Sequence, residues 1–94
     1  MEGDIRVVVI KKVEKQLTKL PIAIVEAFAT WRMSLYFVGM QETRKTKGYH
    51  DEPLQGERFG QRSVRLSRAY RLIYIQYKEE IVVIKVIDIS KHKY

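Results

Sequence analysis

The sequence predicts an α+β fold in which a helical hairpin packs on a small, mainly antiparallel sheet, in the order βααβββ. Three observations predict it: β-branched runs of strand length, a stretch in which apolar residues recur at helical spacing, and turn residues between them. A chain of 94 residues has room for one compact core, so we expect a single domain over residues 1–94.

The first half of the chain predicts one strand and two helices. Residues 5–10 form a β-branched run that is typical of a strand. From Lys12 apolar residues return at helical spacing until Pro21, which suits the first turn of a second helix. In that second helix we expect five side chains to face the core: Ile22, Val25, Phe28, Ala29 and Leu35.

The second half predicts a long polar segment followed by three strands. Residues 41–60 are polar and contain three glycines and a proline, so this stretch is either one long functional loop or a segment whose secondary structure the pattern does not reveal. Three β-rich runs follow, over residues 62–66, 70–77 and 81–89. The last two are close enough in sequence to form a hairpin across residues 78–80.

Composition limits the function classes. The chain has no cysteine, which excludes disulfides and thiolate metal sites and favours a reducing, cytoplasmic location. No apolar run is predicted to target or span a membrane. The net charge of +7 indicates a polyanionic partner, either a nucleic acid or an acidic protein.

Arginines concentrate where the strands of the second half begin. Five of them lie within residues 58–71, namely Arg58, Arg62, Arg65, Arg68 and Arg71. Guanidinium groups bind phosphate in a bidentate manner, so this cluster is a candidate phosphate site, although a solvated strand edge has the same composition. Arg71 shares a strand face with apolar residues, where its charge requires an anion or solvent. Further cations, Arg44, Lys45, Lys47, Lys91 and Lys93, and aromatic rings, Tyr49, Phe59, Tyr70 and Tyr94, suit contacts with phosphates and unpaired bases.

RNA cleavage without a metal needs a base for the ribose 2′-hydroxyl, cations for the phosphorane and an acid for the 5′-oxygen. The chain offers Glu52 or His50 as the base and Arg65 and Arg71 as the cations. His92 or Tyr94 is available as the acid. Taken singly, each of these side chains also fits an ordinary solvated position, so the set as a whole carries the hypothesis.

Other chemistries have weaker support. Two histidines far apart and scattered carboxylates lack metal-ligand spacing, and no glycine-rich loop opens a helix to bind a nucleotide. No serine lies in a nucleophile elbow. We therefore expect neither a metal nor a small-molecule cofactor.

Two segments resemble toxins of the RelE/ParE superfamily. They are GYHDEPLQG at 48–56 and RSVRLSRAYRLIY at 62–74, and the terminal HKY at 92–94 adds to the likeness. The order EPL, glycine, then YRLIY is most similar to the messenger-RNA interferases of RelE, YoeB and HigB type. The resemblance covers nearly the whole chain and implies a RelE-like microbial ribonuclease fold.

The resemblance also implies roles for individual residues. Glu52 matches the general base of YoeB-type toxins, Arg71 matches the arginine that stabilises the transition state, and Arg65 matches a basic strand position. YoeB-type chains end in adjacent His and Tyr, whereas Lys93 separates His92 from Tyr94 here. RelE-type toxins carry lysines on the strand that holds Ser63 and Arg65 here, which argues against a purely lysine-based mechanism.

The implied function is that of a toxin in a type II toxin–antitoxin system, which cleaves messenger RNA in the ribosomal A site and stops translation. Its implied partners are a cognate antitoxin and the message, with Arg58, Arg62, Arg68, Lys91 and Lys93 as RNA contacts. Two alternatives stay open, because ParE-type members share this fold but poison DNA gyrase, and a non-catalytic RNA-binding module would keep the arginines.

Overall fold

A computed structural model describes residues 5–78 and 82–91. The strands are β1 (Ile5–Val9), β2 (Glu52–Pro53), β3 (Arg62–Arg65), β4 (Tyr70–Lys78) and β5 (Val82–Lys91). The helices are α1 (Lys11–Leu17) and α2 (Ile22–Lys45), with single 3₁₀ turns η1 (Lys47–Tyr49) and η2 (Gly56–Arg58). The α+β class and the expected strands are confirmed, with the short β2 as an addition, and the expected turn at 78–80 falls partly outside the described residues.

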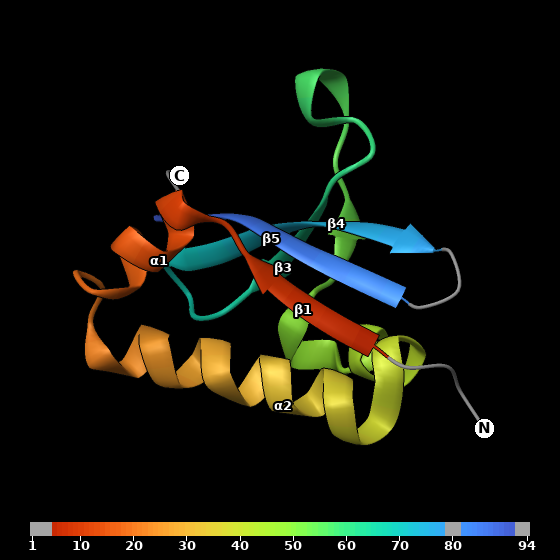
Figure 1. The fold of residues 1–94 in the computed structure, drawn as a ribbon, viewed down its shortest axis with the longest axis horizontal. Coiled ribbons are helices and arrows are strands. Elements are labelled where there is room, and N and C mark those ends of the chain that lie inside the picture. Colours follow the sequence, from red (N-terminus) through yellow and green to blue (C-terminus); the bar gives the residue numbers. More distant parts are fainter. Residues whose placement is uncertain (1–4, 79–81, 92–94) are drawn as a thin grey trace.

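The described strands form one mixed sheet in the order β1-β5-β4-β3-β2. Among the described strands only the β1–β5 pair is parallel, and the other three pairs are antiparallel. In Figure 1 α2 runs beneath the sheet and α1 lies at one end of it, while the η2 loop rises from the far side of β3. The two outermost described strands are β1 and β2.

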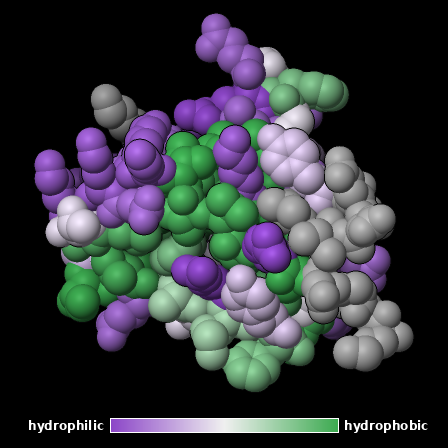
Figure 2. All heavy atoms as spheres, in the orientation of Figure 1, coloured by the Kyte–Doolittle hydropathy of each residue, from purple (hydrophilic) through white to green (hydrophobic). Residues whose placement is uncertain are grey.

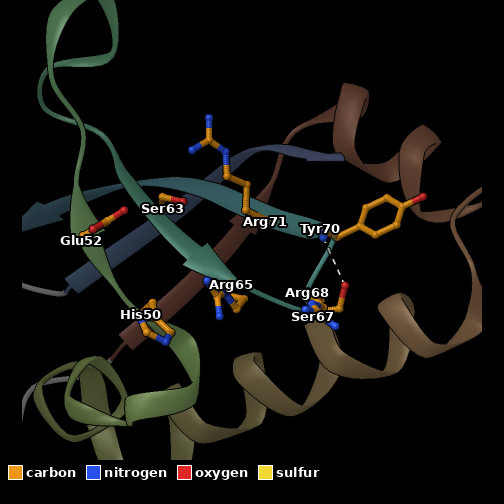
Figure 3. Close-up of a pocket in the computed structure, with 8 residues that line it drawn as sticks. All are labelled: His50, Glu52, Ser63, Arg65, Ser67, Arg68, Tyr70 and Arg71. Carbon is orange, nitrogen blue, oxygen red and sulfur yellow. Dashed lines mark hydrogen bonds between the residues drawn. The ribbon is translucent and has the colours of Figure 1, made fainter. Parts of the chain in front are cut away.

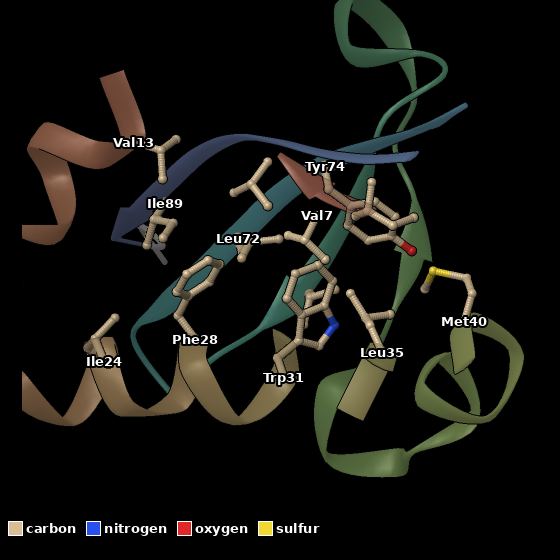
Figure 4. Close-up of a cluster of buried hydrophobic side chains, with 13 residues drawn as sticks. Val7, Val13, Ile24, Phe28, Trp31, Leu35, Met40, Leu72, Tyr74 and Ile89 are labelled. Atoms are coloured by element: carbon tan, nitrogen blue, oxygen red, sulfur yellow. The ribbon is translucent and has the colours of Figure 1, made fainter. Parts of the chain in front are cut away.

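The core lies between α2 and the sheet (Figure 4). Trp31 is fully buried and packs against Tyr74 of β4, with ring centroids 5.5 Å apart. Phe28 and Leu35 extend this contact one helical turn to either side, as Figure 4 shows. These side chains hold α2 to one face of the sheet, and α2 does not cover the opposite face.

The core face of α2 differs in part from the one expected. Phe28 and Leu35 are buried as predicted, but Ile22 is 74% exposed and Ala29 is also exposed. Ile24 and Trp31 are buried in their place, because the helix meets the sheet along the stripe that contains Phe28. Val25 is half-buried.

The expected loop over residues 41–60 was predicted too long, because α2 continues to Lys45. Gly39 has φ 85° and ψ 173° inside this helix, a backbone conformation that only glycine adopts readily, and it divides α2 into two segments. The second segment takes a new direction and buries Met40 and Thr43. The helical period is therefore interrupted at Gly39 rather than ended there.

By length and composition alone α2 could cross a membrane, but its buried stripe packs against the sheet. Its outer face carries exposed apolar side chains, among them Met33 and Phe37. Figure 2 shows apolar atoms reaching the surface over β1 and α2, with hydrophilic side chains gathered over α1.

Candidate active site

A pocket of about 90 Å³ lies where β2, β3 and β4 meet the turn between β3 and β4 (Figure 3). Its lining combines one carboxylate, three arginines, an imidazole and three hydroxyl side chains. These residues are His50, Glu52, Ser63, Arg65, Ser67, Arg68, Tyr70 and Arg71. The pocket therefore contains three of the five side chains that the sequence predicts as catalytic, Glu52, Arg65 and Arg71.

The strand register brings these three side chains to one region. Glu52 of β2 pairs with Ser63 of β3, and Arg65 of β3 pairs with Arg71 of β4. Alternate residues of a strand share a face, so Ser63 and Arg65 point to the same side of the sheet and their partners do likewise. In Figure 3 Arg71 extends away from α2.

Arg65 and Arg71 form a pair of like charges directly opposite each other on neighbouring strands. Such pairs destabilise a sheet unless a counter-charge lies between or beside them. The side chains of Glu52, Arg65 and Arg71 form no hydrogen bond or ion pair with any other residue in the described part of the chain. Two cations and a carboxylate without partners among the described residues have the chemistry to bind a phosphate group.

The turn between β3 and β4 shapes one wall of the pocket. The Ser67 hydroxyl accepts hydrogen bonds from the backbone N–H of Ala69 (3.2 Å) and of Tyr70 (3.1 Å). The Leu66 N–H donates to the Tyr70 carbonyl at 2.9 Å. These bonds fix where β4 begins, and therefore fix Arg71 as its second residue.

Asp51 anchors the segment that carries Glu52. Its carboxylate is 1% exposed and accepts a hydrogen bond from Arg62 Nε at 2.6 Å. It accepts a second hydrogen bond from the Tyr74 hydroxyl at 2.6 Å. His50, just before it, adopts the left-handed conformation at φ 43°, which turns the chain into β2. Asp51 is thereby held beside Arg62 and Tyr74, while the next side chain, Glu52, lines the pocket.

This network also sets the protonation of its members. Burial raises the pKa of the Tyr74 hydroxyl far above its ordinary value, and the hydrogen bond to Asp51 raises it further. Burial alone would lower the pKa of Arg62, but its hydrogen bond and charge contact with Asp51 raise it. At neutral pH the tyrosine is therefore a neutral donor and the arginine is a cation, which is the combination that a buried carboxylate requires.

The five arginines of residues 58–71 have different surroundings. Arg58 donates to Gln61 Oε1 at 2.8 Å and forms an ion pair with Asp88 at 3.4 Å. Arg62 forms an ion pair with Asp51 and does not line this pocket. Arg68 lines the pocket with Arg65 and Arg71. The sequence predicts one cluster of five arginines. In the fold two of them form ion pairs with aspartates, and the other three line the pocket.

The remaining predicted residues belong to the C-terminal end. Lys91 is exposed and pairs in register with Tyr70, so β5 ends beside the pocket. His92, Lys93 and Tyr94 lie outside the described residues.

Sequence reasoning missed two aspartates. Asp51 stands next to Glu52, but its partners are eleven and twenty-three residues away, so no local pattern reveals them. Asp88 could have been found from the sequence, because it is a carboxylate within an apolar strand, where it requires a charged or hydrogen-bonding partner. It joins three elements, contacting Gln16 (3.1 Å) and Lys12 (3.2 Å) of α1 as well as Arg58.

Within the described residues, no three histidine or carboxylate side chains lie close enough together to hold a metal ion. The chemistry that the pocket residues offer is proton transfer and charge stabilisation.

Comparison with known proteins gives a match in structure and none in sequence. No family model matches the chain, and no curated protein matches it by sequence. A YoeB/ParE toxin from Agrobacterium tumefaciens has a similar structure, with a TM-score of 0.69 and 17% identity, covering 94% of this chain and 99% of the toxin. The toxin–antitoxin complex RelBE2 from Mycobacterium tuberculosis matches with a TM-score of 0.61 and 22% identity, covering 98% of this chain and all of the matched one.

YoeB from Staphylococcus aureus, solved as a dimer, is also similar in structure, with a TM-score of 0.60, 15% identity and coverage of 98% of this chain and 100% of that chain. These matches extend over nearly the full length of both partners. They confirm the fold that the two sequence segments imply.

Proposed function

We propose that this chain, which has the fold of the RelE and YoeB toxins, is the toxin of a toxin–antitoxin pair and cleaves messenger RNA without a metal. One observation carries the proposal: Arg65 and Arg71 lie opposite each other, without partners in the described part of the chain, in the pocket that also holds Glu52. This arrangement costs free energy in the free protein and is relieved by a phosphate.

The chemistry follows from these groups. Glu52 takes the proton of the ribose 2′-hydroxyl, and the resulting oxygen attacks the adjacent phosphorus. Arg65 and Arg71 stabilise the extra negative charge of the phosphorane. When the bond from phosphorus to the 5′-oxygen breaks, a protonated group must supply a proton to that oxygen. The products are a 2′,3′-cyclic phosphate and a free 5′-hydroxyl.

The proton donor is assigned to the C-terminal tail. Lys91 ends β5 opposite Tyr70, a residue of the pocket, and three more residues span at most about 10 Å. We propose His92 or Tyr94 as the proton donor, with Lys91, Arg68 and Lys93 supplying cations for the flanking phosphates. His50, which also lines the pocket, is the alternative base.

We further propose that the message is cut in the ribosomal A site, in the cytoplasm, which stops translation. The small pocket supports a ribosome-dependent reaction, because the chain alone encloses little of an RNA strand. A ribosome that presents the strand in a fixed conformation would supply the missing positioning.

An antitoxin is the second proposed partner. A toxin with this activity requires a neutralising protein in the same cell, and the RelBE2 structure contains such a complex for another chain of this fold. We infer that the antitoxin covers the surface formed by residues 58–71 with an acidic or amphipathic segment. Co-purification followed by removal of the partner should restore activity, and a partner bound only to the outer face of α2 would argue against direct occlusion.

The decisive test is translation in vitro, with primer extension along the message. We expect cuts that depend on ribosomes and leave a 5′-hydroxyl. Inhibited DNA supercoiling with an intact message would instead support the gyrase-poisoning alternative. RNA binding with neither effect would support a non-catalytic module.

A further inference from the structure

A second and larger cavity, of about 370 Å³, opens at the other end of β2. Glu52 lines the first pocket and Pro53, the next residue, lines the second. The two pockets lie on opposite faces of the sheet, because neighbouring residues of a strand point to opposite sides. Since β2 is the outermost strand on its side of the described sheet, a strand of nucleic acid that wraps around this edge would reach both. The lining of the second cavity includes two arginines, three glutamines and a phenylalanine, namely Arg44, Arg62, Gln55, Gln61, Gln76 and Phe59.

The cavity has a surplus of positive charge. Arg44 and Arg62 are the only charged residues among the described residues that line it, and both face the carboxylate of Asp51, at 3.8 Å and 2.6 Å. One carboxylate therefore balances two guanidinium groups. Arg44 Nε is buried and makes no hydrogen bond within the described residues, so this donor lacks an acceptor. The Arg44 side chain as a whole is 34% exposed, so a phosphate in the cavity would supply the missing negative charge to its guanidinium group.

Amide donors line the same cavity. Arg58 donates to the side-chain oxygen of Gln61 at 2.8 Å, and Arg44 donates to that of Gln76 at 2.6 Å. With their oxygens engaged, these glutamines present their NH₂ groups as donors. Such donors suit the acceptor atoms on the edges of unpaired bases.

An exposed ring completes the set. Phe59 is 78% exposed at the cavity, a costly position for a large apolar side chain in water. A base can stack on such a ring whatever its sequence.

We propose that the second cavity binds one unpaired nucleotide of single-stranded RNA, adjacent to the nucleotide that is cut. The inference rests on the proposed function in that RNA is the ligand. RNA is favoured over an acidic peptide because one nucleotide supplies an anion, a flat face and an edge of acceptors together. The site would thus hold the strand in register with the first pocket.

The test is NMR titration of the ¹⁵N-labelled chain with a trinucleotide of 2′-O-methyl RNA, which has no hydroxyl nucleophile and cannot be cut. The amides of Gln55, Gly60 and Gln76 should shift. Phe59→Ala should weaken binding by about fivefold or more. Phe37→Ala is the matched control, because Phe37 is also 78% exposed but lies on α2, and it should leave the affinity unchanged.

Equal affinity of the two phenylalanine variants, or no shift at these amides, would overturn the second site. An acidic peptide that shifts the same amides and excludes the RNA would assign the cavity to a protein partner instead. Cleavage of the message on programmed ribosomes is measured in parallel. Phe59-dependent RNA binding without cleavage would keep the site and reject the proposed function, whereas cleavage without these shifts would do the reverse.

Discussion

At the scale of residues, the arginines divide by whether the protein itself supplies their counter-charge. Arg58 and Arg62 each have a carboxylate partner, Asp88 and Asp51. Arg65 and Arg71 have none in the described part of the chain. The first pair stabilises the fold, and the second pair has its charge available for a ligand.

Arg71→Ala should lower the rate of cleavage by about a hundredfold or more, because the positive charge of Arg71 stabilises only the transition state. Single-turnover cleavage on programmed ribosomes measures the rate, and circular dichroism checks the fold. Ribosome affinity should stay near the wild-type value.

Two further variants complete this experiment. Glu52→Gln keeps the shape of the side chain, removes the base and should also abolish most cleavage. Arg32→Ala removes an exposed arginine of α2 and should have no effect. Folded Arg71→Ala protein that cuts at the wild-type rate would refute the assigned role.

At the scale of elements, the strands were predictable because β-branched runs have few alternatives. The short β2 was not, since two residues form a strand only by pairing with β3. The second segment of α2 was missed because Gly39 reorients the helix and shifts its buried stripe.

The arginine sites were predictable in part at this scale. Arg62 and Arg65 are three residues apart on one strand and therefore face opposite sides of the sheet. The alternation of side chains along the strand thus predicts that Arg62 and Arg65 have different surroundings. The partner of Arg62, Asp51, lies in a loop whose path no local sequence pattern predicts.

Gly39→Ala should destabilise the protein by about 1–3 kcal/mol, because a β-carbon is strained in this backbone conformation. Urea unfolding measures the change. Gly48→Ala is the matched control, since a β-carbon there meets no atom within 4 Å and its effect should stay within about 0.5 kcal/mol. Equal effects of the two substitutions would show that Gly39 does not hold the bend.

Asp88 makes the joint between α1, β5 and η2 sensitive to pH. Burial alone would raise its pKa, but hydrogen bonds from Gln16 and Lys12 and the charges of Lys12 and Arg58 lower this pKa below its ordinary value. A carboxylate with a lowered pKa in the folded state stabilises that state above its unfolded pKa, and this stabilisation is lost as the pH falls through the folded pKa.

The free energy of unfolding should therefore decrease as the pH is lowered below about 4. In the Asp88→Asn variant the free energy of unfolding should decrease less steeply over the same range. Urea unfolding at pH 6 and pH 3 gives the comparison. Lys12→Met should remove part of the same dependence. An equally steep decrease in Asp88→Asn would assign the acid sensitivity to other carboxylates.

At the scale of the whole molecule, a net charge of +7 favours polyanions in general, and in the proposed function the pocket would select one phosphate among them. Catalysis by a carboxylate and arginines needs no metal ion, and the described residues contain no cluster of metal ligands.

Cleavage should accordingly persist in EDTA when the ribosomes are kept intact by a polyamine and are assayed for integrity. The measurement is primer extension with and without the chelator, and EDTA-treated ribosomes re-supplied with Mg²⁺ are the control. Activity on free RNA that the chelator abolishes would refute the proposed mechanism.

The two-residue length of β2 has a consequence for the dynamics of the site. Arg71 belongs to a nine-residue strand paired on both sides, whereas Glu52 is held by two register pairs at the margin of the sheet. Local opening therefore costs least at β2, and its amides should exchange with solvent hydrogen faster than those of β4. The carboxylate can detach while the cations keep their positions. An inhibitor that displaces β2 would therefore remove the proposed base from the pocket without unfolding the protein.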